Sequence, residues 1–127
     1  MGIHHEIELT ATPATVYSRL IDGKQFSALT GAPAAITAEE GGSFSIFGGM
    51  ITGRTIELEK DRRIVQAWRV KNWRPGLYST AHFELEPKGN GTRVVFEHTG
   101  FPEEEREHLD KGWYANYWEP LRKAEQR

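Results

Sequence analysis

The sequence has no cysteine among its 127 residues. This excludes disulfide bonds, thiolate nucleophiles and cysteine-ligated metals, and it fits a reducing cytosolic setting. No apolar run approaches the roughly 20 residues of a membrane-spanning helix. The first residues also lack the basic segment and apolar core of a signal peptide. We therefore expect a cytoplasmic protein with no membrane partner.

Charge of one sign is also scarce. The chain carries 16 basic and 18 acidic residues, which are interleaved and leave a net charge of −2. A chain without a basic stripe has no electrostatic footprint for nucleic acid, so we expect no nucleic-acid partner. An apolar content of 38% over 127 residues supports one hydrophobic core. We expect a single domain over residues 1–127.

Motifs for catalysis or metal binding are missing as well. The glycine pairs at 41–42 and 48–49 lack the lysine and the strand-to-helix context of a phosphate-binding loop. His4 and His5 are adjacent on an expected strand, so they face opposite ways and are poorly placed to share a metal. The sequence thus predicts a protein that is not an enzyme and has no metal or cofactor. A catalytic triad assembled in space stays open as an alternative.

The elements that are present follow the order strand, helix pair, strand meander, long helix. Residues 3–10 alternate in polarity, as in a half-buried strand. Thr12 and Pro13 predict a helix start, and residues 22–23 predict a break before more helical turns over residues 24–31. Six strand candidates separated by short turns follow, at residues 35–40, 43–47, 51–59, 64–73, 77–86 and 92–99. This order predicts an α+β fold with helices on one face of an antiparallel sheet.

Aromatic residues are concentrated near the C-terminus, in the segment Trp113-Tyr114-Ala115-Asn116-Tyr117-Trp118. Leu109, Trp113, Tyr117 and Leu121 recur at steps of four residues, which predicts a helix with a broad apolar stripe. A stripe of this width must be covered. We expect the helix to lie across the concave face of a curved sheet.

Two residues in this expected helix depart from good helix formers. Gly112 costs about 1 kcal/mol relative to alanine, and close packing of the helix against the sheet would explain it. Pro120 removes one helical hydrogen bond and disfavours helical geometry at Glu119. We expect a kink or an early end of the helix at Pro120.

Alternation along the strands assigns side chains to the concave face. Gln66 and His98 fall among its apolar residues, and Arg54 joins them if it shares a face with Ile56 and Leu58. A buried polar group without a partner costs roughly 1 to 3 kcal/mol, so these groups need internal hydrogen bonds, water or a ligand. Satisfied core groups and a ligand cavity are both compatible with this pattern. The small residues at 79 and 81 would help to leave space for a cavity.

Several short motifs in their order carry a resemblance to a known family: Gly41-Gly42-Ser43-Phe44, Ile64-Val65-Gln66-Ala67-Trp68-Arg69, Asn72-Trp73, Gly91-Thr92, Pro102-Glu103-Glu104 and Gly112-Trp113. The chain resembles the C-terminal domain of the activator of heat shock protein 90 ATPase and the single-domain proteins similar to it. The resemblance implies a START-like helix-grip fold, in which a curved antiparallel sheet grips a long C-terminal helix. It also implies a heat shock protein 90-type chaperone as a partner.

In the two-domain members of that family, a separate N-terminal domain supplies much of the chaperone binding. This chain begins with its first expected strand and leaves no place for that domain. We therefore expect weak chaperone binding without full activation.

The leading hypothesis is a non-enzymatic binding module for a protein partner, a small hydrophobic ligand in a cavity under the C-terminal helix, or both. One alternative is a co-factor that stimulates a chaperone ATPase without the N-terminal activator domain. Another is an enzyme on a hydrophobic substrate, with His98 as its general acid or base. The residues expected to line the cavity are Gln66, Trp68, Phe83, Phe96, His98, Trp113 and Tyr117.

Overall fold

A computed structural model describes residues 2–125. Its strands are β1 (Ile3–Leu9), β2 (Ala35–Ile36), β3 (Ser43–Ile46), β4 (Ile51–Glu59), β5 (Arg63–Val70), β6 (Ser79–Lys88) and β7 (Gly91–Thr99). Its α-helices are α1 (Pro13–Ile21), α2 (Gly23–Thr30), α3 (Arg106–Trp113) and α4 (Glu119–Ala124). Two 3₁₀ turns, η1 (Phe47–Gly49) and η2 (Glu103–Glu105), and a π-helical turn, η3 (Tyr114–Trp118), complete the description. None of the helices within these residues is long and apolar enough to cross a membrane.

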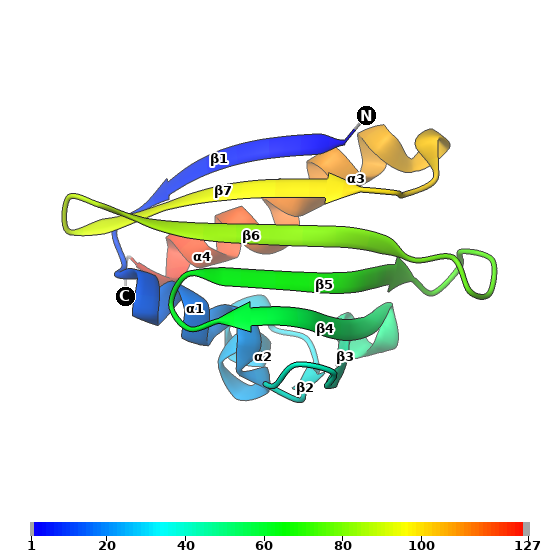
Figure 1. Ribbon diagram of the computed structural model, residues 1–127, viewed down its shortest axis with the longest axis horizontal. Coiled ribbons are helices and arrows are strands. Elements are labelled where there is room, and N and C mark those ends of the chain that lie inside the picture. Colours follow the sequence, from blue (N-terminus) through cyan, green and yellow to red (C-terminus); the bar gives the residue numbers. More distant parts are fainter. Residues whose placement is uncertain (1, 126–127) are drawn as a thin grey trace.

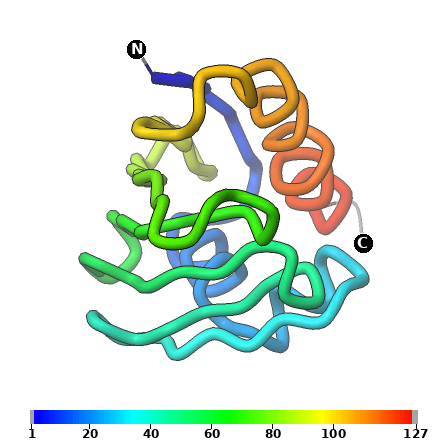
Figure 2. Tube along the Cα trace, turned by 90° about the vertical axis from the view of Figure 1, so that its right-hand side faces the viewer, coloured from blue at the N-terminus to red at the C-terminus, as the bar shows by residue number. Residues whose placement is uncertain are grey.

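The strands form one antiparallel sheet in the order β1-β7-β6-β5-β4-β3-β2. Figure 1 shows the helices together on one face of this sheet. Turned by 90°, the sheet curves, and the C-terminal helical segment, orange to red, lies on its open side (Figure 2). The predicted α+β helix-grip architecture is confirmed.

The first helix begins where Thr12 and Pro13 predict, and the break predicted at residues 22–23 separates it from the second. Thr12 caps α1 by accepting a hydrogen bond from the backbone N–H of Thr15 at 3.3 Å, and Pro13 occupies the first turn. Asp22 ends α1 and caps α2 by accepting from the N–H of Gln25 at 3.0 Å. The helix pair therefore forms a corner with almost no connecting chain.

Strand β4 corrects the expected positions of two side chains. Arg54 and Ile56 are exposed, whereas Leu58 packs against the core. The cause is a β-bulge between Thr55 and Glu57, where the pairing with β5 shifts by one residue. Before the bulge the buried positions are 51, 53 and 55. The prediction that Arg54 shares an inward face with Ile56 and Leu58 is therefore wrong.

Strands β2 and β5 are shorter than predicted, and β6 is shifted toward the C-terminus with its predicted length unchanged. The strand expected over residues 35–40 pairs only at Ala35–Ile36, because residues 37–42 fold into a turn with hydrogen bonds from Glu39 to Thr37 and from Gly42 to Glu39. Strand β5 ends at residue 70 and β6 begins at residue 79. The chain between them forms a loop, which includes a turn bond from the N–H of Trp73 to the carbonyl of Val70 at 3.0 Å.

The C-terminal helix does not end at Pro120, so the expectation of an early end there is wrong. Helical backbone continues through Ala124, and the irregular turn lies just before the proline, over Tyr114–Trp118. There the N–H of Glu119 bonds to the carbonyl of Tyr114, five residues back, as in a π-helix. This wider turn lets adjacent residues Tyr117 and Trp118 both be buried.

Candidate functional site

The centre of the grip is filled by aromatic rings. Trp113 packs on Phe96 with ring centroids 4.2 Å apart and on Tyr117 at 4.3 Å, and Phe83 packs on Phe96 at 5.0 Å. All four side chains are buried. Only a void of about 10 Å³ remains next to Gln66, Phe83 and Tyr117. The central cavity expected beneath the helix is thus occupied by the helix's own side chains.

His98 lies in this packed centre and forms part of a hydrogen-bond chain. The indole Nε1–H of Trp113 donates to His98 Nδ1 at 3.0 Å, which leaves Nε2 to carry the imidazole proton. Nε2–H donates to Ser79 Oγ at 2.7 Å, and Ser79 donates to the carbonyl of Trp68 at 2.8 Å. Burial lowers the pKa of His98 to about 3. His98 is therefore a neutral, fully paired core residue that orients Trp113.

A second indole–imidazole pair lies one strand away and was not predicted. Trp118 Nε1–H donates to His5 Nδ1 at 2.9 Å, and the Nε2 of His5 bonds to Asp110 Oδ1 at 2.7 Å. The ring of Tyr114 packs against the imidazole at 4.4 Å. The inward parity of His5 in residues 3–10 was a usable signal. The partnership with Trp118 depends on the π-helical turn, which sequence periodicity does not reveal.

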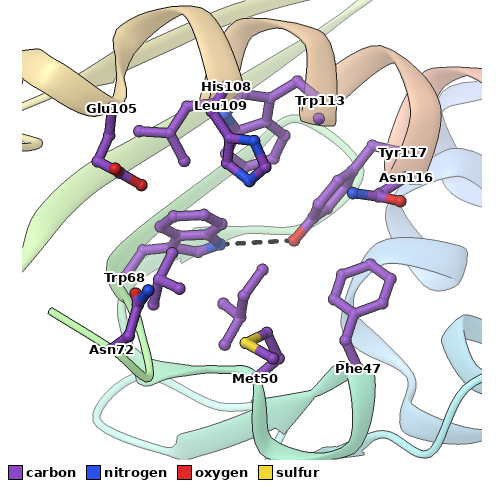
Figure 3. A pocket seen from close by; sticks show the side chains of 13 residues that line it. Phe47, Met50, Trp68, Asn72, Glu105, His108, Leu109, Trp113, Asn116 and Tyr117 are labelled. Atoms are coloured by element: carbon purple, nitrogen blue, oxygen red, sulfur yellow. Dashed lines mark hydrogen bonds between the residues drawn. The ribbon is translucent and has the colours of Figure 1, made fainter.

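An open groove of about 490 Å³ lies beside the packed centre (Figure 3). One wall comes from η1 and the adjoining ends of β4 and β5, and the other comes from α3 and η3. The lining residues are Phe47, Met50, Ile51, Trp68, Val70, Asn72, Glu105, His108, Leu109, Gly112, Trp113, Asn116 and Tyr117. Most of these side chains are apolar or aromatic, as in ligand pockets of this size.

Three of the seven predicted site residues line this groove: Trp68, Trp113 and Tyr117. The other four do not. Gln66 and Phe83 border the small void, and Phe96 and His98 lie in the packed interior. The groove residues missed from the sequence include Phe47 of η1, because the glycine pair that follows it predicts an ordinary hairpin turn.

Gly112 lies at the groove and not at a close helix-to-sheet contact. A Cβ atom built on Gly112 meets nothing nearer than Asn116 Nδ2, at 3.6 Å, which is an ordinary van der Waals distance. The expectation that close packing demands this glycine is therefore wrong. The residue gives up helix stability of about 1 kcal/mol and leaves the groove unfilled.

Polar groups lie along the rim and at the floor of the groove. Glu105, His108, Asn72 and Asn116 lie along its rim, and Glu105 and Asn72 also border a neighbouring hollow of about 530 Å³. At the floor, Trp68 Nε1–H donates to the hydroxyl of Tyr117 at 3.5 Å (Figure 3). Burial raises the pKa of the Tyr117 phenol, which therefore stays protonated at neutral pH.

No cluster of three or more His, Asp or Glu side chains suited to a metal ion occurs within residues 2–125. The neighbouring hollow includes Trp73, which is 7% exposed and whose Nε1 has no hydrogen-bond partner among the described residues.

Comparison with known proteins identifies relatives along most of the chain. Residues 10–124 match the family described as "Activator of Hsp90 ATPase homolog 1-like protein". "Activator of 90 kDa heat shock protein ATPase homolog 1" from Mus musculus is 30% identical over 113 residues, which are 89% of this chain and 33% of that protein. The chain thus spans about a third of the length of these curated relatives.

Solved structures agree with this result. An HSP90 activator from Plasmodium falciparum superimposes with a TM-score of 0.88 at 26% identity, over 95% of this chain and 93% of that one. The Aha1 dimer from Colwellia psychrerythraea has the same fold, with a TM-score of 0.83 at 19% identity over 98% of this chain and 96% of that one. The chain belongs to the family of activator of Hsp90 ATPase homolog 1-like proteins.

Proposed function

We propose that this protein is a non-enzymatic binding module that holds a small apolar ligand in the groove between α3 and the ends of β4 and β5. The observation that carries the proposal is an apolar groove of about 490 Å³ kept open at a helical glycine, Gly112. A larger side chain at this position would fill the groove and strengthen the helix. Retaining glycine is therefore best explained by use of the space.

The environment of His98 favours binding over catalysis. Both of its ring nitrogens are engaged, and the side chain is fully buried outside the groove lining. A general base must reach the proton that it removes, directly or through one water molecule. His98 would reach a groove ligand only if Trp113 left its place.

The test uses the neutral dye N-phenylnaphthylamine, which fluoresces in apolar surroundings, and the substitution Gly112→Leu. We expect saturable dye binding to the wild-type protein and at least about tenfold weaker binding to Gly112→Leu, because the leucine occupies the groove. Ala115→Leu is the matched control, since Ala115 is exposed on the same helical segment outside the groove lining. Equal affinity in Gly112→Leu and Ala115→Leu would refute the proposal.

A second candidate function is contact with a heat shock protein 90-type chaperone. The names of the mouse relative and of the Plasmodium falciparum structure favour it. Because the matched segment is about a third of the mouse protein, we propose that residues 1–127 by themselves bind the chaperone weakly and stimulate its ATP turnover little. Titration into a cognate chaperone, with binding and ATPase rate measured together, tests this. Strong stimulation, or no binding at high micromolar concentration, would contradict it.

A further inference from the structure

The floor of the groove holds two hydrogen-bond donors that are poorly used within the protein. Trp68 and Tyr117 are 2% and 4% exposed. Their polar atoms face each other at the floor of the groove (Figure 3). Their separation of 3.5 Å exceeds the usual 2.7 to 3.2 Å of an N–H···O bond. The indoles of Trp113 and Trp118, in the same core, donate to histidine nitrogens at 3.0 and 2.9 Å.

The donor count at this point exceeds the acceptor count. An indole nitrogen only donates, whereas a phenol both accepts and donates. The Tyr117 oxygen receives the long bond from Trp68, and no group among residues 2–125 takes the hydroxyl proton of Tyr117 in return. A buried donor left without an acceptor costs free energy, so an incoming acceptor is favoured at this position.

The surroundings define the kind of acceptor that fits. Phe47, Ile51 and Leu109 provide apolar walls, and the one carboxylate of the lining, Glu105, lies on the rim. An anion would lose its hydration in such a site and would meet no cation, because the lining contains neither lysine nor arginine. A neutral oxygen with two lone pairs satisfies both donors without that penalty.

We infer that the ligand is a neutral, mainly apolar molecule with a carbonyl or ether oxygen at its buried end, held by Tyr117 O–H and Trp68 Nε1–H. This inference rests on the proposed function, since it specifies the ligand of the same groove. It adds a polar anchor point to a site that otherwise selects by shape and apolar area.

The experiment compares two probes of nearly equal shape, acetylnaphthalene and ethylnaphthalene, as competitors of N-phenylnaphthylamine. The ethyl compound is the more hydrophobic, so a purely apolar groove would favour it. We expect the wild-type protein to favour the acetyl compound, and the preference to fall about fivefold in Tyr117→Phe, as loss of one hydrogen bond predicts. Tyr114→Phe is the control, because Tyr114 is 42% exposed and outside the groove lining.

The carbonyl stretching frequency of bound acetylnaphthalene gives a readout that a merely structural role of Tyr117 would not move. Relative to the same compound in an apolar solvent, the carbonyl stretch should move to lower frequency when the compound binds the wild-type protein or Tyr114→Phe. The shift should be smaller in Tyr117→Phe. If wild type and Tyr117→Phe show the same preference between the probes, the hydrogen bonds to the ligand oxygen are refuted. The proposal that the groove binds an apolar ligand is then unaffected. If the wild-type protein binds neither probe nor the dye, the ligand site itself is refuted together with the anchor.

Discussion

Trp113 and His98 fix each other's orientation in the core. Trp113 donates to the imidazole at 3.0 Å and also touches Phe96, Trp68 and Tyr117 through its ring. Its outer surface forms part of the groove wall. One side chain thus links the packed centre to the candidate ligand site, so that its position determines both stability and the shape of the groove.

Replacing Trp113 with alanine should cost about 3 to 5 kcal/mol in the free energy of unfolding, because it removes a large ring that is 2% exposed. Denaturant unfolding followed by circular dichroism measures this. Tyr114→Ala, one residue along the helix and 42% exposed, should cost about 1 kcal/mol or less. Similar losses in the two variants would contradict a packed role for Trp113.

The buried imidazole of His98 should make stability depend on pH. Its pKa is about 3 in the folded protein against 6.5 for an ordinary histidine, so between these values the unfolded chain binds the extra proton. The stabilisation is therefore complete above about pH 6.5 and is lost as the pH falls toward 3, by at most about 1.4 kcal/mol per pH unit.

Urea unfolding between about pH 7 and about pH 5 tests this expectation on wild type and His98→Asn. Asparagine keeps an acceptor for Trp113 but has no ionisable group in this range. The variant should be less stable at neutral pH and should lose less stability on acidification. An identical pH slope in both proteins would assign the acid sensitivity to other groups.

At the scale of secondary structure, irregular turns decide which residues meet. The π-helical turn at Tyr114–Trp118 brings both Tyr117 and Trp118 to the buried side, whereas adjacent residues of an α-helix lie about 100° apart around its axis. The bulge after Thr55 likewise turns Ile56 outward while Leu58 stays against the core. In each case one extra residue shifts the faces on which the following side chains lie, relative to the regular period of the sequence.

Deleting Ala115 should convert the π-helical turn into regular α-helix. The wide turn holds one extra residue, so its deletion leaves Trp118 and Leu121 at the same rotation about the helix axis, and we expect a loss of no more than about 1 kcal/mol in the free energy of unfolding. Deletion of the exposed Lys111 is the control, because it removes a residue from regular α-helix, rotates Leu109 by about 100° relative to Trp113, and should cost at least about 3 kcal/mol or prevent folding. Equal losses in the two deletion variants, measured by denaturant unfolding, would contradict one extra residue in the wide turn.

On the scale of the whole molecule, the sheet provides a rigid wall and the groove lies near its less-paired end. Strands β6 and β7 are paired on both sides over most of their length. Strand β2 has only two residues and forms the edge of the sheet opposite to β1. The groove wall at η1 adjoins β3 and β4, nearer to that edge. Local opening at the edge would therefore change the groove before it disturbed the aromatic centre.

Native-state hydrogen exchange should reveal this gradient. The amides of Phe83 and Phe96, in β6 and β7, should exchange only through global unfolding, and those of β2 and η1 should exchange through smaller openings. Measurement by NMR at increasing denaturant separates the two classes. Uniform protection across the sheet would instead indicate one cooperative unit that includes the groove wall.

The sequence alone determined the fold class, the antiparallel meander and the burial of the C-terminal helix. These follow from local alternation, the capping residue Thr12, the break at residues 22–23, and an apolar stripe too broad to remain in water. The inward positions of Trp68 and His98 follow from the same alternation.

Only the tertiary structure decided where space remains. Whether the aromatic stripe fills the concave sheet depends on the volumes of side chains from distant segments and on the register of the bulge and the π-helical turn. These moved the candidate site from the centre of the grip to the groove at Gly112, and made His98 a paired core residue. Packing volume is a property of the assembled chain, and local periodicity does not contain it.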